Sequence, residues 1–187
     1  MDHYIDIRVR PDPEIATAHI LNALADRLHL ALVGLEARDI GISFPRFRSD
    51  RPSLGDTLRL HGTSAALSAL MVKGWAVMLA DYVEVGAATP VPIGAKHRVV
   101  VRRQATSNAD RVRRRQMKRQ GWSEEEARAR IPDSIEKRLD LPYLELRSRS
   151  TGQPYRLFIE HRPCQNEAVR GNFNAFGLSA SATVPWF

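Results

Sequence analysis

Strand-like and helix-like segments follow one another in a fixed order over the first ninety residues, and this order restricts the possible folds. In residues 4–10, apolar side chains alternate with charged ones, the two-residue period of a strand with one buried face. Leucines then recur at the three- and four-residue spacing of a helix, at Leu21, Leu24, Leu28 and Leu32. Residues 11–14, Pro-Asp-Pro-Glu, predict a cap and a first-turn proline for this helix.

Two more strands, a second helix and a fourth strand are expected before residue 86. Apolar alternation predicts strands in residues 40–44 and 58–60, with a polar loop between them. Ser64 is placed to cap a helix over residues 65–73, which Gly74 ends, and residues 82–85 form the last strand. The order strand-helix-strand-strand-helix-strand predicts a ferredoxin-like, or RRM-like, amino-terminal domain.

Prolines and a glycine in residues 87–94 predict a linker, so we expect two domains, at residues 1–94 and 95–187. In the second, strands are expected at residues 97–104, 143–149 and 155–161. A helix over residues 109–120, capped by Ser107 or Asn108 and ended by Gly121, should be followed by a short helix with a capping box at Ser123. The expected class is α+β, with a carboxy-terminal α/β domain that carries an arginine-rich helix.

Positive charge is concentrated in one segment. Residues 98–119 hold nine of the 28 basic side chains and one acid, Asp110, whereas the rest of the chain has 19 basic and 20 acidic residues. So dense a cluster repels itself in the folded protein, which is most simply explained by a polyanionic partner. Nucleic acid is the leading candidate.

The predicted helix over residues 109–120 carries most of this charge on one face. At about 100° per residue, five cations fall in a stripe about 140° wide: Arg111, Arg114, Arg115, Lys118 and Arg119. A solvated charged face is the alternative, but nearby acids do not balance these cations. Membrane binding is a weaker interpretation, because the opposite face lacks the large apolar side chains that it requires.

Phosphate contacts give affinity without sequence choice, so recognition of a particular sequence requires other residues that contact the bases. Arg102 and Gln104 lie two apart on a predicted strand and point the same way. Arginine suits the O6/N7 edge of guanine and glutamine the N6/N7 edge of adenine. Two solvent-facing polar residues would look the same, and the residues alone leave both interpretations open.

Several classes are disfavoured by what the sequence lacks. The single cysteine, Cys164, excludes an internal disulfide, and neither histidine pairs nor paired acids form a convincing metal site. We expect no cofactor and no metal. The start lacks a signal-peptide pattern, and the most apolar stretch, residues 65–80, is interrupted by Lys73 and Gly74. We therefore expect a cytoplasmic protein without a membrane span.

RNA can be cut without metal when a base with a pKa near neutrality removes the 2′-hydroxyl proton, and histidine is the usual base. His29 lies at the edge of the apolar face of the first predicted helix. A partly buried structural histidine is the competing interpretation. Ser148 lies in a hydroxyl-rich strand end, where an ordinary turn serine is the simpler interpretation.

Several stretches taken together resemble the CRISPR repeat-RNA processing endoribonuclease of type I-F systems. They are the segment MDHYIDIRVRPDPE at the start, Ser107-Asn108 before the arginine-rich helix, SEEEARARIPD from Ser123, STGQPYRLFI from Ser150, and the final VPWF. The resemblance runs from end to end of the chain. It implies a ferredoxin-like domain and a second domain whose arginine-rich helix enters the major groove of a repeat hairpin.

The resemblance also implies an activity. Such enzymes serve antiviral defence by cutting CRISPR precursor RNA at the 3′ base of the stem without metal, leaving a 2′,3′-cyclic phosphate. They then retain the mature guide RNA and join the other subunits of the surveillance complex. By position, His29 would be the general base and Ser148 would hold or activate the 2′-hydroxyl. Phe176 stands where the family commonly has a tyrosine beside the histidine, so a hydroxyl that could orient His29 is absent.

The remaining roles concern RNA binding. Arg102 and Gln104 would read a guanine and an adenine low in the stem, and Tyr155 would stack beneath its terminal base pair. Ser150 and Thr151 would lie beside the scissile phosphate. Further RNA contacts are expected from Ser107, Arg111, Arg114, Arg115, Lys118 and Arg119.

Two other functions remain open. The chain could be a non-catalytic RNA-hairpin binding protein on the same fold, with His29 structural. More weakly, it could be a basic protein that assembles on ribonucleoprotein particles without choosing a hairpin.

Overall fold

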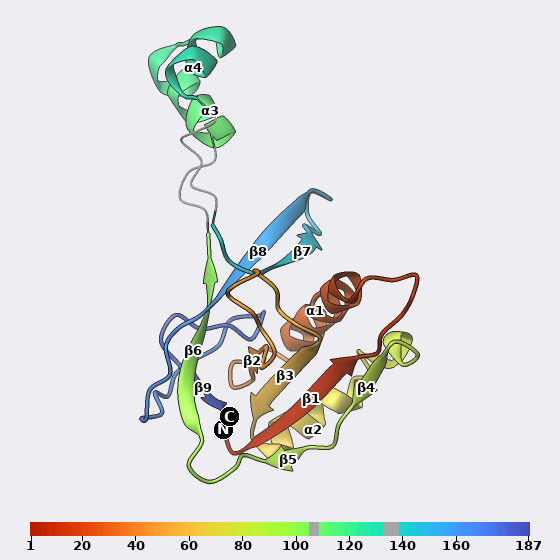
Figure 1. Cartoon of the computed structure of the whole chain (residues 1–187). Coiled ribbons are helices and arrows are strands. Elements are labelled where there is room, and N and C mark those ends of the chain that lie inside the picture. Colours follow the sequence, from red (N-terminus) through yellow and green to blue (C-terminus); the bar gives the residue numbers. More distant parts are fainter. Residues whose placement is uncertain (105–108, 133–138) are drawn as a thin grey trace. The chain divides into compact units, whose positions relative to one another are not determined.

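The computed structural model describes residues 1–104, 109–132 and 139–187. Contacts divide the chain into two compact units, one made of Met1–Arg102 with Leu141–Phe187 and the other of Arg103–Asp140. The larger unit contains both sheets, and the described residues of the smaller unit form the helices α3 and α4 (Figure 1). The domain boundary expected at residue 94 stays a prediction.

The first sheet has the ferredoxin-like strand arrangement, with order β2-β3-β1-β4 and a short β5 pairing with β1. Helices α1 and α2 pack against its central strands (Figure 1). The predicted strand-helix-strand-strand-helix-strand order is therefore confirmed. Its elements are β1 His3–Val9, α1 Thr17–Gly34, β2 Gly41–Ser43, β3 Thr57–Gly62, α2 Ser64–Val72, the 3₁₀ turn Val77–Leu79, β4 Val83–Val85 and β5 Thr89–Pro90.

Two helix starts differ from the prediction. Asp12 does not cap α1, because its carboxylate accepts hydrogen bonds from the backbone N–H groups of Glu14 and Ile15, both at 2.8 Å. This closes a turn ahead of the helix, which begins at Thr17 without a side-chain cap. Helix α2 is capped by Thr63 and not by Ser64, since the Thr63 hydroxyl accepts from the N–H of Ala66 at 3.1 Å.

The second sheet has the order β7-β8-β6-β9, in which β7 and β8 form an antiparallel hairpin. Strands β6, β7 and β8 correspond to the predicted strands, whereas β9 was not predicted from the sequence. The sheet consists of β6 Lys96–Arg103, β7 Tyr143–Arg147, β8 Pro154–His161 and β9 Thr183–Trp186. Strand β9 also packs beside β2, which joins the two sheets into one unit.

In the described part of the smaller unit, α3 Ala109–Gln120 and α4 Glu124–Arg130 pack on each other. Gly121 follows α3 with a φ of 70°, the left-handed conformation that ends a helix, as predicted. The predicted capping box of α4 is confirmed, with Ser123 and Glu126 each bonded to the other's backbone N–H. The predicted cap of α3, Ser107 or Asn108, lies outside the described residues.

The arginine-rich helix is anchored by one of its own arginines. The guanidinium of Arg113 donates to the carbonyl of Ile131 at 2.9 and 2.6 Å and to Asp110 at 3.1 Å. Ala109 of α3, Ala127 of α4 and Ile131 after α4 are buried. Arg113 therefore ties the arginine-rich helix to the residue that follows α4.

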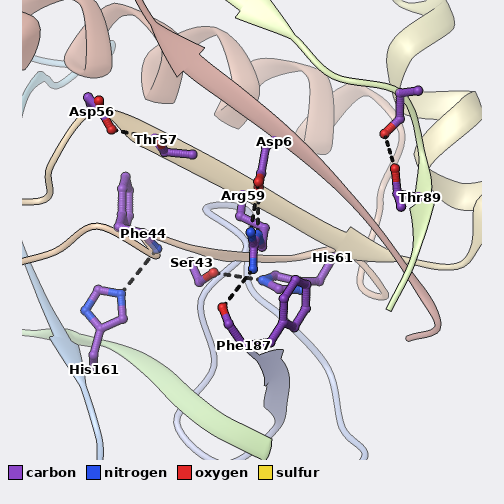
Figure 2. A network of polar contacts seen from close by, with 11 residues as sticks. Asp6, Ser43, Phe44, Asp56, Thr57, Arg59, His61, Thr89, His161 and Phe187 are labelled. Carbon is purple, nitrogen blue, oxygen red and sulfur yellow. Dashed lines mark hydrogen bonds and ion pairs between the residues drawn. The ribbon is translucent and has the colours of Figure 1, made fainter. Parts of the chain in front are cut away.

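An ion pair lies under the carboxy-terminal residue, on the face of β1 and β3 opposite to the helices. Arg59 donates to both carboxylate oxygens of Asp6, at 2.6 and 2.8 Å, and to the carbonyl of Phe187 at 3.3 Å (Figure 2). Its guanidinium lies between aromatic rings, 4.6 Å from the ring centre of Tyr4 and 4.1 Å from that of Phe187.

His61, which is fully buried, and His161, which is half-buried, are both held in neutral form. His61 is hydrogen-bonded to the Ser43 hydroxyl at 2.8 Å, and His161 accepts from the N–H of Phe44 at 3.3 Å (Figure 2). The ring of His161 also stacks on Phe47, with centroids 4.0 Å apart. Burial lowers the pKa of each histidine to about 3, because a charged imidazole would lose its hydration.

Acid should therefore destabilise the fold through these histidines. Below pH 6.5 a histidine in the unfolded chain binds a proton, whereas the same histidine in the folded protein stays neutral. The unfolded state is therefore stabilised relative to the folded state as the pH falls toward 3. When the pH is lowered from 7 to 5, the free energy of unfolding should fall in both proteins, and the fall should be about 2 kcal/mol smaller in His161→Phe than in the wild type. Urea unfolding at both pH values measures this, with His19→Gln, an exposed histidine on α1, as the control. Equal losses in His161→Phe and the wild type would contradict the assignment.

No helix in the described part of the chain is both long and apolar enough to cross a bilayer.

Candidate functional site

His29 lies half-buried on α1, and two contacts fix its imidazole ring. Nδ1 is 2.8 Å from the carbonyl oxygen of Ala175. Because a carbonyl oxygen only accepts hydrogen bonds, Nδ1 carries a hydrogen, and in the neutral imidazole this leaves the lone pair on Nε2. The ring of Phe176 stacks on the imidazole with centroids 4.0 Å apart and planes 5° from parallel. The ring is thus oriented without a hydroxyl at position 176.

The predicted serine and threonine cluster is a compact turn between β7 and β8. The hydroxyl of Ser148 is 3.1 Å from that of Ser150 and accepts from the N–H of Thr151 at 3.3 Å. Main-chain bonds close the same turn, with the Ser148 carbonyl accepting from Gly152 at 2.7 Å. The structure therefore brings Ser148, Ser150 and Thr151 together.

The face of α1 that carries His29 also forms polar contacts with β7 and the residues that follow it. Asn22, Asp26 and His29 fall within about 60° on this helix. Asn22 accepts from the N–H of Glu145 at 2.9 Å, and Asp26 forms an ion pair with Arg149 at 2.8 Å. These two bonds tie α1 to β7 and to the residue after Ser148.

A cavity of about 420 Å³ lies where α1 and β7 meet. Its walls include Asn22, Asp26, Ser148 and Arg149. Charged, polar and apolar residues all line this cavity, so it can admit part of a ligand beside Ser148. Sequence reasoning missed Asn22, Asp26 and Arg149, although the helical spacing of the first two with His29 was a usable signal.

Arg102 lies on β6 and Tyr155 on the neighbouring β8. Burial raises the pKa of the Tyr155 phenol, while the nearby Arg102 guanidinium acts in the opposite sense. Among the described residues, Nε of Arg102 is buried without a hydrogen-bond partner. Strand β6 ends at Arg103, so Gln104 lies just beyond the strand and is exposed.

The predicted cationic stripe of α3 lies on its exposed face. All five of its side chains are solvent-exposed: Arg111, Arg114, Arg115, Lys118 and Arg119. The half-buried side chains of the helix are those of the other face, including Val112, Arg113 and Met117. Ser107 lies outside the described residues.

In the residues that the structure describes, no group of three or more His, Cys, Asp or Glu side chains is arranged to hold a metal ion.

Comparison with known proteins connects these features to a family. The family model described as CRISPR-associated protein (Cas_Csy4) matches residues 4–187. A CRISPR-associated endonuclease Cas6/Csy4 from Pseudomonas aeruginosa (strain UCBPP-PA14) is 48% identical over 187 residues, which cover both chains completely. One of the same name from Escherichia coli (strain UTI89 / UPEC) is 44% identical over 188 residues, again covering both chains. The chain therefore belongs to the Cas_Csy4 family of CRISPR-associated proteins.

Proposed function

We propose that the chain is a metal-independent endoribonuclease that binds the hairpin of CRISPR repeat RNA and cuts at the 3′ base of its stem. The observation that carries the proposal is the fixed tautomer of His29, whose Nε2 is left able to accept a proton. Its family relatives, named endonucleases, support the same activity class.

In the proposed reaction, Nε2 of His29 takes the proton of the ribose 2′-hydroxyl, which Ser148 positions. The 2′-oxygen attacks the adjacent phosphorus, the bond from phosphorus to the 5′-oxygen breaks, and a 2′,3′-cyclic phosphate forms. The leaving oxygen takes a proton from solvent. Proton removal contributes about 10²–10⁴-fold, and in-line positioning supplies the rest of the acceleration.

Binding would use separate sets of residues. The exposed cations of α3 form a row roughly 12 Å long, at about 1.5 Å rise per residue, which suits several phosphates of one groove. A-form RNA has a deep, narrow major groove, and a short hairpin opens it at its ends. Arg102 and Gln104 would read base edges, and Tyr155 would stack under the last pair.

The product should remain bound, since a cut at the base of the stem leaves the contacts to the stem intact. The bound guide RNA would then bring the chain together with the other subunits of the surveillance complex.

A second candidate is a hairpin-binding protein without activity. The satisfied Nδ1 and the stacked ring of His29 are also what a structural histidine would show. Incubating the protein with a labelled repeat hairpin in EDTA separates the two. A fragment with a cyclic phosphate end supports the nuclease, and tight binding without a cut supports the second candidate. Equal binding of a scrambled stem would indicate a basic protein without hairpin choice.

Arg102→Ala should cost about 1–3 kcal/mol of binding to the cognate stem and relax sequence choice at one base pair. The reason is the loss of bidentate hydrogen bonds from the arginine to the O6 and N7 atoms of a guanine. Binding assays with the cognate stem and a stem altered at that pair measure the effect, with the exposed Arg51→Ala as the control. Equal losses on both stems would make Arg102 a phosphate contact instead.

A further inference from the structure

The carbonyl that holds His29 belongs to a tight loop organised by Asn174. The side-chain oxygen of Asn174 accepts from the N–H groups of Phe176 at 2.8 Å and Leu178 at 3.2 Å. Its main chain is engaged as well, accepting from Gly177 at 2.8 Å and donating to Leu178 at 2.9 Å. One residue thus makes four hydrogen bonds that close the loop around Ala175.

The loop is also fixed to the amino-terminal sheet. Phe173 donates to the carbonyl of Arg38 at 2.9 Å, and the carbonyl of Gly177 accepts from Ile42 of β2 at 2.9 Å. Gly177 has a φ of 69°, and a Cβ there would lie 2.7 Å from a methyl carbon of Ile42. The loop therefore cannot shift along β2 without breaking these contacts.

We propose that Asn174 is a positioning residue for the His29 imidazole. By closing the loop, it places the Ala175 carbonyl where only an Nδ1–H can reach it and holds the Phe176 ring against the imidazole face. Both contacts to His29 depend on residues that Asn174 organises. The inference rests on the proposed function, because the selected tautomer matters only if His29 removes a proton.

The chemical consequence lies at Nε2. With the hydrogen on Nδ1, Nε2 has a lone pair available for the 2′-hydroxyl proton. The other neutral tautomer has its hydrogen on Nε2 and cannot accept there. Once the carbonyl is displaced, this tautomer becomes available, and the fraction of protein competent for cleavage falls. Asn174 acts at a distance and touches neither proton nor substrate.

The test compares Asn174→Ala with Asn174→Ser, which keeps a weaker neutral acceptor for the same backbone groups. Asn174 is exposed, so truncation opens no cavity. Nitrogen-15 NMR of the His29 ring, in protein without RNA, reads the tautomer. We expect Nδ1–H in the wild type, a shift toward Nε2–H in Asn174→Ala, and an intermediate population in Asn174→Ser. Single-turnover cleavage should slow about tenfold in Asn174→Ala, recover partly in Asn174→Ser, and leave hairpin affinity unchanged.

The outcomes separate the two proposals. If Asn174→Ala keeps the wild-type tautomer, the positioning role is wrong, whether or not His29→Ala is inactive. If its tautomer shifts while cleavage stays at the wild-type rate, the base role of His29 fails and the positioning role fails with it. Should Asn174→Ala not fold, the tautomer population and rate of Asn174→Ser decide alone, and wild-type values of both overturn the proposal.

Discussion

His29→Ala should reduce single-turnover cleavage of a repeat hairpin by about 10²–10⁴-fold while changing hairpin affinity by no more than about threefold. The expected loss follows from removing the base, whereas the cations of α3 that would supply affinity are not altered. Gel-based cleavage under enzyme excess and fluorescence anisotropy give the two numbers.

His19→Ala is the matched control, since His19 is an exposed histidine on the same helix. It should cut and bind like the wild type. A parallel fall in cleavage, binding and thermal stability in His29→Ala would mean that His29 is a structural residue, held by Ala175 and Phe176 for the sake of the fold.

Asp6→Asn should lower the free energy of unfolding by about 3 kcal/mol, the low end for a broken buried ion pair. The side chain of Arg59 is 10% exposed, so without the Asp6 carboxylate a desolvated cation remains between two aromatic rings. Arg59→Met should cost less. The side chain of Asp6 is 35% exposed and can be hydrated once its partner is gone.

Urea unfolding followed by circular dichroism measures both losses, and Asp50→Asn serves as the control. Asp50 pairs with Arg48 on the surface, where each side chain is 61% exposed, so its substitution should have no measurable effect. Equal losses in Asp6→Asn and Asp50→Asn would show that burial of Arg59 does not govern the energy of the pair.

Much of the fold could be predicted because local patterns and tertiary contacts agree. The apolar alternation in residues 4–10 and the leucines of α1 face one core, so periodicity alone located both elements. The capping box at Ser123 and the helix end at Gly121 depend only on neighbouring residues, so both could also be predicted from the sequence.

Strand β9 could not be predicted from the sequence, because its extended conformation depends on pairing with another strand. The segment Thr183–Trp186 includes a proline and is preceded by small residues, and it becomes a strand by pairing with β6. Similarly, Asp12 has the sequence of a cap but bonds within a turn, which no spacing rule distinguishes from a helix start.

Some residues of the candidate site could likewise be predicted from the sequence, and others could not. Histidine chemistry and a cationic helical stripe are properties of side chains, so His29 and the stripe of α3 could be found in the sequence. The partner of His29 is a main-chain carbonyl, 146 positions away at Ala175, and any residue type supplies a carbonyl. Only the folded loop identifies it.

The most direct test of the account removes one oxygen atom, the 2′-oxygen, from the substrate. After the cut site is mapped on an all-RNA repeat hairpin, the same hairpin is made with a 2′-deoxyribose at the nucleotide that precedes the cut. The account predicts that the protein binds this hairpin with unchanged affinity and leaves it intact in EDTA, since the attacking oxygen is missing. Cleavage of the deoxy hairpin at the same position would contradict it.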